Sequence, residues 1–302
     1  MQRRSEPPRF DTEAFRVRDA VATGSSRTRL TRRDLTAPIH GVRAPVDLDL
    51  RLVEAIAVVM RRDQFVSHLD AARLWGGPVP ARFDGGPVHV TSIGDSPIMR
   101  RPQVTPHRTR LVDVPVDTVR GIRVSTPARA WFECASLLTE EELVVLGDHF
   151  VGPAGLATPD DLAASIVAGS RSARRARAAL ARVRPGVESP MESRMRLAVV
   201  DAGFAEPEIN VDVTDDDGGF LGRVDLSWPA LRIGLEYDGD HHRDRSTFRH
   251  DQRRSNGFVV NGWILIHATA SDAARPAVLF ERLRQAFVQR RLARMAPSGQ
   301  SS

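Results

Sequence analysis

The order of the apolar segments after Pro185-Gly186 limits the second half of the chain to one broad fold class. This Pro-Gly pair separates two helical patterns and marks a domain boundary. A helix follows it, with Ser189 as the N-cap and Pro190 in the first position. Then come three strands, a polar helix, a buried strand and an amphipathic helix, predicted over 209–213, 222–228, 231–237, 246–257, 263–267 and 278–287. This alternation predicts an α/β domain.

Two carboxylates interrupt the apolar pattern of neighbouring strands. Asp225 lies inside the strand 222–228, and Glu236 lies near the end of the next strand. If Trp228-Pro229-Ala230-Leu231 turns these strands into a hairpin, the two carboxylates approach each other on one face. Burying both is costly unless a cation lies between them, and hard divalent cations such as Mg²⁺ or Mn²⁺ take oxygen ligands. The sequence therefore predicts a metal site that activates water for attack on a phosphate, with Glu192 as a third oxygen ligand.

Each of these residues also has a structural interpretation. Asp225 can pair with Arg223 or Arg232 at the sheet edge, and Glu236 can be a strand-end residue that reaches solvent. A carboxylate in the first turn of a helix, such as Glu192, is favoured by the macrodipole in any case. The metal site is indicated by the combination of these carboxylates in one order, and not by any single residue.

A histidine pair, His241 and His242, follows the second carboxylate strand. A histidine beside a metal–carboxylate site can act as a general base or position the water, whereas a surface loop is the alternative. Asp238-Gly239 on its own would be a turn. In the polar helix, Asp251 and Arg254 are three residues apart and share a face, which either points at the site or carries a surface ion pair.

Composition excludes several classes of protein. All 43 basic residues of the 302-residue chain are arginine, because the sequence contains no lysine. The 38 acidic residues leave a net charge of +5, which permits nucleic-acid binding without requiring it. Aromatic residues make up 6%, too few for a base-stacking platform, and a single cysteine, Cys134, allows neither an internal disulfide nor a cysteine-based zinc site. With no signal-peptide pattern and no apolar stretch near about 18 residues, we expect a cytoplasmic protein without membrane association.

The pattern divides the chain into five parts. They are a flexible basic arm or simple tail (1–45), an α+β N-terminal domain (46–155), a helical linker (156–186), the α/β domain (187–292) and a disordered tail (293–302). Within the N-terminal domain, helices predicted near 48–60 and 67–75 form either a helix-turn-helix or a helical hairpin that packs its own core.

The predicted linker contains a helix rich in alanine and arginine, with no acidic residue. Its Arg174, Arg175 and Arg177 can lie along a phosphate backbone, and Arg254 of the α/β domain is a fourth candidate contact to nucleic acid. A solvated helix between domains is an equal alternative for this segment.

Four segments of the second half resemble one recurring pattern. They are Ser189-Pro190-Met191-Glu192, Arg223-Val224-Asp225-Leu226-Ser227-Trp228-Pro229, Glu236-Tyr237-Asp238-Gly239-Asp240-His241-His242 and Gly262-Trp263. Over about residues 187–292 the chain resembles the domain of unknown function 559, which is similar to very-short-patch-repair endonucleases of the PD-(D/E)XK nuclease-like fold. The resemblance implies a restriction-endonuclease-like central sheet flanked by helices, a magnesium-dependent phosphodiesterase ancestry, and DNA as the substrate.

The resemblance also implies residue roles. It places Glu192 at the helix carboxylate, Asp225 at the strand aspartate, and Glu236 at the first acidic position of the (D/E)XK element. Asp238 stands where the wider superfamily usually has lysine, and in the narrower family Asp-Gly followed by His is the usual form. Because this chain has no lysine and an arginine stays protonated, the better-aligned histidine, His242, is the first candidate for orienting the water.

The first half shows a second resemblance. Residues 48–155 resemble the N-terminal half of actinobacterial proteins identified as abortive-infection type IV antitoxins, through Gly121-Ile122-Arg123-Val124-Ser125-Thr126-Pro127-Ala128-Arg129. Together, the two halves predict a metal-dependent DNA endonuclease. The alternative is a non-catalytic DNA-binding regulator, or an antitoxin-like component of a toxin–antitoxin or phage-defence system. In either case the N-terminal domain is a candidate surface for a protein partner.

Overall fold

The computed structural model of the protein describes residues 12–111, 113–238, 254–269, 272 and 275–295. It is an α/β structure, which confirms the predicted fold class, and its described strands form three sheets. The chain forms two compact units, one from Met1–Leu143 with Ala157–Ala178 and one from Val144–Leu156 with Ala179–Ser302. The predicted linker is thus divided between the units. No helix in the described part of the chain is both long and apolar enough to cross a membrane.

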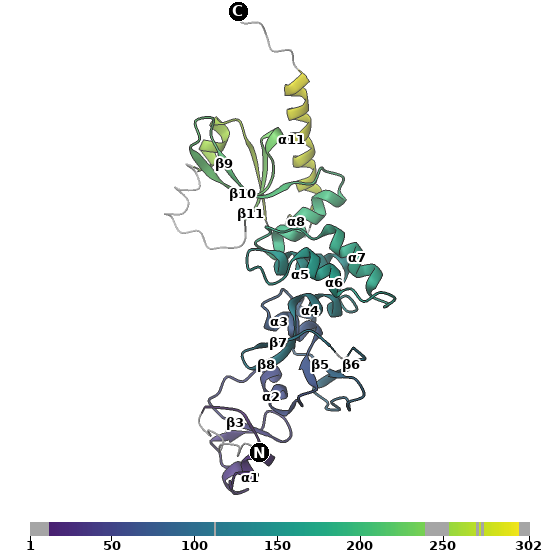
Figure 1. The fold of residues 1–302 in the computed structure, drawn as a ribbon. Coiled ribbons are helices and arrows are strands. Elements are labelled where there is room, and N and C mark those ends of the chain that lie inside the picture. The colour runs from purple at the N-terminus through teal and green to yellow at the C-terminus, as the bar shows by residue number, and fades with distance from the viewer. Residues whose placement is uncertain (1–11, 112, 239–253, 270–271, 273–274, 296–302) are drawn as a thin grey trace, which may run out of the picture. The chain divides into compact units, whose positions relative to one another are not determined.

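The first unit is drawn in purple to teal in Figure 1. Its elements are β1 (Phe15–Arg16), α1 (Val17–Ala22), β2 (Leu35–Thr36), β3 (Val42–Pro45), α2 (Leu52–Val59), β4 (Gln64–Val66), α3 (His68–Leu74), β5 (Val88–Ile93), β6 (Val104–Thr109), β7 (Val116–Val119), β8 (Ile122–Ser125), α4 (Pro127–Cys134) and α6 (Pro159–Ser165). Helices α5 (Glu140–Val151) and α7 (Ala173–Arg182) each contribute residues to both units.

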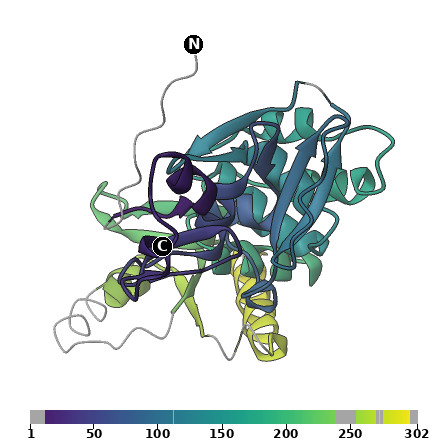
Figure 2. The same ribbon diagram turned by 90° about the horizontal axis from the view of Figure 1, so that it is seen from below.

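The main sheet of the first unit has the strand order β6-β5-β4-β8-β7 and is seen from below in Figure 2. The pairs β5–β6 and β4–β8 are parallel, and the other two pairs are antiparallel. Helix α2 buries Ala55 and Ile56 against Val88 and Val90 of β5. This packing fixes β5 and β6, the strands that carry His89 and His107.

Strand β4 lies between α2 and α3. Its residues Gln64, Phe65 and Val66 are buried, and they pair with β5 and β8. The expectation that α2 and α3 are joined by a tight turn, as a helix-turn-helix or a helical hairpin, is therefore wrong. The physical reason is that the three residues of this short connection are buried and hydrogen-bonded as the central strand of the sheet, whereas a turn at the surface would expose them to water.

Residues 15–45, for which the sequence predicts a flexible arm, are ordered as a small sheet with the order β1-β3-β2 and the helix α1. Phe15, Ala20 and Leu30 are buried together in a local cluster. These apolar residues are spaced without a helical or strand period inside a basic segment, so the sequence pattern does not reveal the cluster.

The second unit contains α8, a four-stranded sheet and further helices (Figure 1). Its elements are α8 (Pro190–Asp201), β9 (Glu208–Thr214), β10 (Phe220–Trp228), β11 (Ile233–Tyr237), a helix over residues 254–260, β12 (Ile264–Ala268) and α11 (Ala277–Met295). The predicted start of α8 is confirmed, because Ser189 Oγ accepts the Glu192 N–H at 3.2 Å and Pro190 occupies the first position.

The sheet of the second unit has the order β12-β11-β10-β9. Strands β9, β10 and β11 are antiparallel neighbours, whereas β11 and β12 are parallel. Buried residues of α8 and α11 pack against Leu226 and Leu235 in one cluster, and Phe258 of the helix 254–260 packs against Val213 and Val224 in another. The sheet is thus covered by helices and is central to the unit.

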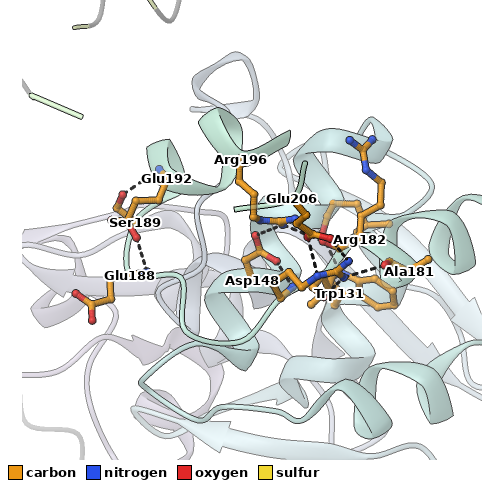
Figure 3. Close-up of polar contacts among 12 residues, drawn as sticks. Trp131, Asp148, Ala181, Arg182, Glu188, Ser189, Glu192, Arg196 and Glu206 are labelled. Carbon is orange, nitrogen blue, oxygen red and sulfur yellow. Dashed lines mark hydrogen bonds and ion pairs between the residues drawn. The ribbon is translucent and has the colours of Figure 1, made fainter. Parts of the chain in front are cut away.

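A buried ion pair joins α8 to α5 within the second unit (Figure 3). Arg196 Nη2 lies 2.9 Å from Asp148 Oδ2, and the two side chains are only 2% and 0% exposed. This contact holds the helix that carries Glu192 against the part of α5 that belongs to this unit.

Candidate carboxylate site of the second unit

The β10–β11 hairpin brings Asp225 and Glu236 to adjacent strands. The strands are joined by the short turn η3 (Pro229–Leu231), as the sequence predicts. Leu226 pairs with Leu235 in the antiparallel ladder, so Asp225 and Glu236 hold the next positions outward from the turn. The first requirement of the predicted site, two carboxylates on neighbouring strands, is therefore met.

Asp225 is half-buried among like charges. The backbone N–H of Tyr237 donates to Asp225 Oδ2 at 2.8 Å. Burial, followed by the negative charges of Glu192 and Glu236, raises the pKa of Asp225 to about 6, although the Tyr237 hydrogen bond and the charge of Arg254 oppose the rise. Glu192 and Glu236 are therefore close enough for their charges to disfavour the ionisation of Asp225.

The structural interpretations of Asp225 and Glu236 are not supported by the contacts. Arg223 Nη2 lies 2.6 Å from Glu188 Oε1, and Arg232 Nη2 lies 3.2 Å from Asp216 Oδ1, so both arginines are engaged by other acids. Glu236 is only 7% exposed, and its interpretation as a strand-end residue that reaches solvent is wrong.

Glu192 is held at the start of α8 and is only 8% exposed. Its Oε2 accepts the Glu188 N–H at 3.0 Å and Asn210 Nδ2 at 2.8 Å. Figure 3 shows the side chain beside Ser189 and Glu188 at the beginning of the helix. Glu192 therefore stabilises its own helix terminus, as the macrodipole argument predicts, and its charge still acts on Asp225.

Arg254 places a fixed positive charge on Glu236. Its Nη1 donates to Glu236 Oε2 at 2.9 Å, its Nη2 donates to Glu236 Oε1, and Nη2 also donates to the Arg223 carbonyl oxygen at 2.6 Å. Gly222 makes room for this arrangement, because it has a φ of 153° and a Cβ there would lie 2.4 Å from Arg254 Nε. The sequence predicts Arg254 as a contact to nucleic acid, whereas its guanidinium lies inside the carboxylate site.

His267 is a site residue that the sequence analysis missed. It pairs with Glu236 across the parallel strands β11 and β12. Its Nδ1 lies 3.3 Å from Asp238 Oδ2 and 3.8 Å from Glu236 Oε2, and the side chain is 39% exposed. A histidine at the end of a buried strand is a detectable signal, but only the parallel pairing of β12 with β11 brings it to these carboxylates.

His241 and His242 lie outside the described residues, as does Asp251. Their predicted roles in orienting water or facing the site stay predictions. Asp238 is described, and its backbone N–H donates to the Ala268 carbonyl oxygen at 2.8 Å, which extends the β11–β12 pairing by one step.

The donor set of this site fits a hard divalent cation. The described carboxylates of Glu192, Asp225 and Glu236 do not form a group with all ligand atoms within 4.8 Å of one another. Mg²⁺ keeps several waters and needs only one or two carboxylates, so a looser arrangement is sufficient. The repulsion that raises the pKa of Asp225 is what a cation would relieve. Arg254 already supplies positive charge to Glu236, so Asp225 and Glu192 are the carboxylates that could hold an ion.

The arginines predicted to contact nucleic acid differ in their surroundings. Arg174 and Arg177 are exposed on α7, opposite its buried alanines. Arg175 Nη1 instead donates to the carbonyl oxygens of Ala135 and Leu138 at 2.8 and 3.0 Å, which fixes α7 to the end of α4. All three side chains are exposed, and Arg174 and Arg177 are better placed to meet a polyanion because Arg175 is held by these carbonyl groups.

Five further arginines line a cleft of about 730 Å³ in the first unit, namely Arg16, Arg18, Arg27, Arg43 and Arg101. Arg16 and Arg101 donate to the backbone carbonyl oxygens of Met60 and His40, and so belong to the local fold. Arg18 and Arg27 line the cleft from the segment predicted as a basic arm, and Arg18 Nε lies 3.3 Å from Asp19 Oδ1.

The chain was compared with known proteins and structures. No family model matches it, and no solved structure matches it. It is 31% identical over 108 residues to two proteins of Mycobacterium tuberculosis, Uncharacterized protein MT2308 of strain CDC 1551 and Uncharacterized protein Rv2248 of strain H37Rv. The match covers 35% of this chain and 40% of each relative.

Proposed function

We propose that the second unit is a metal-dependent phosphodiesterase of the endonuclease type that acts on DNA. The observation that carries this proposal is the half-buried carboxylate of Asp225, which has a pKa of about 6 beside Glu192 and Glu236. Such a cluster of acids is unfavourable without a cation and is suited to phosphate chemistry with one. The resemblance of the sequence around these residues to PD-(D/E)XK nucleases supports the same conclusion.

Each residue of the site has a distinct part in this proposal. Asp225 and Glu192 hold the cation, and a bound Mg²⁺ or Mn²⁺ supplies water activation and stabilises charge at the phosphate. Arg254 keeps Glu236 in place and provides the fixed positive charge that lysine provides in the wider superfamily. An arginine cannot act as a base, so the proton of the water passes to a histidine. His242 is the candidate from the sequence, and His267 is the candidate from the contacts with Asp238 and Glu236.

The DNA is proposed to lie along exposed arginines. Arg174 and Arg177 lie on α7, which has no acidic residue, and further arginines line the cleft of the first unit. We infer a cytoplasmic protein, since the single cysteine, Cys134, is buried and unable to form a disulfide within the chain. A protein partner would bind through the first unit.

Nicking of supercoiled plasmid tests the catalytic proposal. The full chain is incubated with Mg²⁺ or Mn²⁺, and the wild type is compared with Asp225→Asn. Glu208→Gln is the matched control, because Glu208 is an exposed acid in the same sheet. We expect Asp225→Asn to slow nicking at least about 100-fold, the range for loss of a group that stabilises transition-state charge, and the control to cleave normally. The catalytic proposal fails if wild type and Asp225→Asn are equally inert across DNA forms and both metals.

Metal binding is tested separately from turnover. Mg²⁺ or Mn²⁺ is expected to raise the melting temperature of the wild type, and Asp225→Asn is expected to abolish that rise. Stabilisation without nicking would show an assembled metal site in a protein that does not cut the DNA supplied.

The alternative function is a non-catalytic DNA-binding regulator, or an antitoxin-like component of a defence system. The specific observation that favours it is the contact of Arg254 with both oxygens of Glu236, since this arginine takes a place that a cation would need. A salt-dependent mobility shift without cleavage supports the alternative. In that case Asp225→Asn leaves binding intact, whereas Arg174→Ala with Arg177→Ala weakens it and reduces its salt dependence. Absence of DNA binding at low salt contradicts both functions.

A further inference from the structure

Three histidines from separate elements meet in the first unit, apart from the carboxylate site. His68 begins α3, His89 lies in β5 and His107 lies in β6. Their ligand nitrogens all lie within 4.8 Å of one another, a geometry that no other group of three His, Cys, Asp or Glu side chains shows among the described residues. Nδ1 of His89 is 2.9 Å from Nε2 of His107, and the His68 and His107 ring centroids are 3.8 Å apart.

The pairing of β5 with β6 and the backbone conformation of His68 bring these rings together. In the parallel pair β5–β6, Thr91 pairs with His107, so His89, two residues before Thr91, points to the same face of the sheet. His68 has a φ of 53°, a left-handed conformation that is unfavourable for a residue with a Cβ. Its N–H is held by Glu133 Oε2 at 3.1 Å. Strain of this kind persists where the surrounding structure fixes it, and it is common at binding sites.

Hydrogen bonds through Ser67 fix the orientation of the His68 ring. Ser67 Oγ lies 2.9 Å from Nδ1 of His68, and Thr91 Oγ1 donates to Ser67 Oγ at 2.8 Å. Both Ser67 and Thr91 are buried. A histidine that binds a metal through one ring nitrogen commonly bonds an oxygen through the other. This contact therefore leaves Nε2 of His68 as the nitrogen for a ligand.

Burial disfavours the charged form of all three rings. Burial, followed by the neighbouring histidines, lowers the pKa of His68 well below its usual range and that of His89 to about 4, and burial lowers the pKa of His107. Neutral imidazole is the form that binds metals. The carboxylates of Asp70 and Glu133 accept the backbone N–H groups of His89 and His68, and their charges are balanced within the fold by Arg73 and Arg129.

We propose that His68, His89 and His107 bind one divalent transition-metal ion, with Zn²⁺ preferred, and leave a fourth coordination position open to water or another ligand. Imidazole ligands suit Zn²⁺, Cu²⁺ and Ni²⁺ and not the hard Mg²⁺ proposed for the other unit. Zn–N bonds of about 2.0–2.1 Å at tetrahedral angles place ligand nitrogens roughly 3.3 Å apart, close to the 2.9 Å between His89 Nδ1 and His107 Nε2. The His68 ring is stacked on His107 at an interplanar angle of 20°, so it must turn to bring its nitrogen to the same ion. His89 and His107 are half-buried, which keeps the open position accessible. Three protein ligands with one open position are typical of catalytic zinc sites.

Zinc titration of the full chain, without an affinity tag, tests this site. Calorimetry is expected to show one Zn²⁺ per chain, and Co²⁺ in its place is expected to give the visible absorption bands of a nitrogen-ligated ion. His107→Ala is expected to weaken Zn²⁺ binding by more than about 100-fold, and Ser67→Ala by about 10-fold, as for loss of a residue that orients a ligand. His40→Ala is the matched control and is expected to bind normally, because His40 is an exposed histidine of the same unit.

Several outcomes would overturn the proposal. One is the absence of Zn²⁺ binding by the wild type at 100 µM metal, a concentration far above about micromolar affinity. Others are unchanged binding by a folded His107→Ala variant, or loss of binding in a His241→Ala/His242→Ala variant, which would assign the ion to the other unit. If circular dichroism shows that His107→Ala is unfolded, the Co²⁺ spectrum of the wild type decides: nitrogen-ligand bands support the site, and their absence refutes it. The result is independent of plasmid nicking with Mg²⁺.

Discussion

Replacement of Arg196 by methionine tests the physical reasoning about the second unit most directly. The Arg196 guanidinium is buried with Asp148, and its Nη2 also donates to the Arg182 carbonyl oxygen at 2.8 Å (Figure 3). Asp148 Oδ1 accepts the backbone N–H of Arg184 at 2.8 Å. Arg196→Met keeps much of the side-chain volume but removes the positive charge, so the Asp148 carboxylate stays buried with its charge uncompensated.

The expected loss of stability follows from that uncompensated charge. Removing one partner of a buried ion pair costs about 3–5 kcal/mol, whereas an exposed pair contributes at most about 1 kcal/mol. Burial already raises the pKa of Asp148 despite the opposing charge of Arg196. Without Arg196 this pKa rises further, so the carboxyl group takes up a proton as the pH falls. The loss of stability is therefore full above that pKa and disappears below it. The free energy of unfolding of the variant should be closer to that of the wild type at pH 5 than at pH 7.5.

Urea unfolding at pH 7.5 and pH 5 measures this effect, and hydrogen exchange of peptides from β10 and β11 reports the second unit separately from the first. The control is Asp201→Asn, which breaks the Arg182–Asp201 pair, where Asp201 is 62% exposed. The double variant Asp148→Leu/Arg196→Met is expected to recover most of the stability, since it removes both buried charges. The reasoning is refuted if Arg196→Met costs less than about 1 kcal/mol, or if the double variant is as unstable as the single one.

Three further predictions concern other sites. In EDTA, Asp225→Asn is expected to gain about 1 kcal/mol of stability, because it removes one of three repelling charges; a lower melting temperature would contradict this. Gly222→Ala is expected to cost about 1–3 kcal/mol in urea unfolding, because its Cβ would collide with Arg254, and an unchanged midpoint would count against that contact. The hydrogen bond from Arg82 lowers the pKa of Glu142 from 4.5 to about 2. The stability that this pair contributes is therefore present above pH 4.5 and is lost as the pH falls toward 2. The pair is exposed, so the stability difference between wild type and Glu142→Gln should shrink from at most about 1 kcal/mol at pH 7 to nearly zero at pH 2, and equal differences would contradict the shift.

Local patterns in the sequence predicted much of the second unit. The cap at Ser189, the proline at Pro190 and the short turn after Trp228 are signals between residues only a few positions apart. Such signals report backbone geometry that does not depend on the rest of the fold. They were sufficient to place Asp225 and Glu236 on adjacent strands of one hairpin, because the hairpin register follows from the turn.

The N-terminal segment shows where local patterns fail. Residues 15–45 are ordered by the burial of Phe15, Ala20 and Leu30, which are far apart in the sequence and follow no period. The short strand β4 was missed for a similar reason, since three residues are too few to show alternation. In both places the structure is determined by pairing with distant strands.

The sequence by itself determined the α/β class, the start of α8 and the pair of acidic strand positions, because each depends on neighbours along the chain. Only the tertiary structure decided what surrounds those acids. Arg254 reaches Glu236 from a separate helix, and His267 reaches it through a parallel strand pairing. The meeting of His68 with His89 and His107 has the same origin. The order of strands in a sheet is fixed by packing of the whole unit, and so the partners of a side chain across that sheet cannot be inferred from sequence spacing.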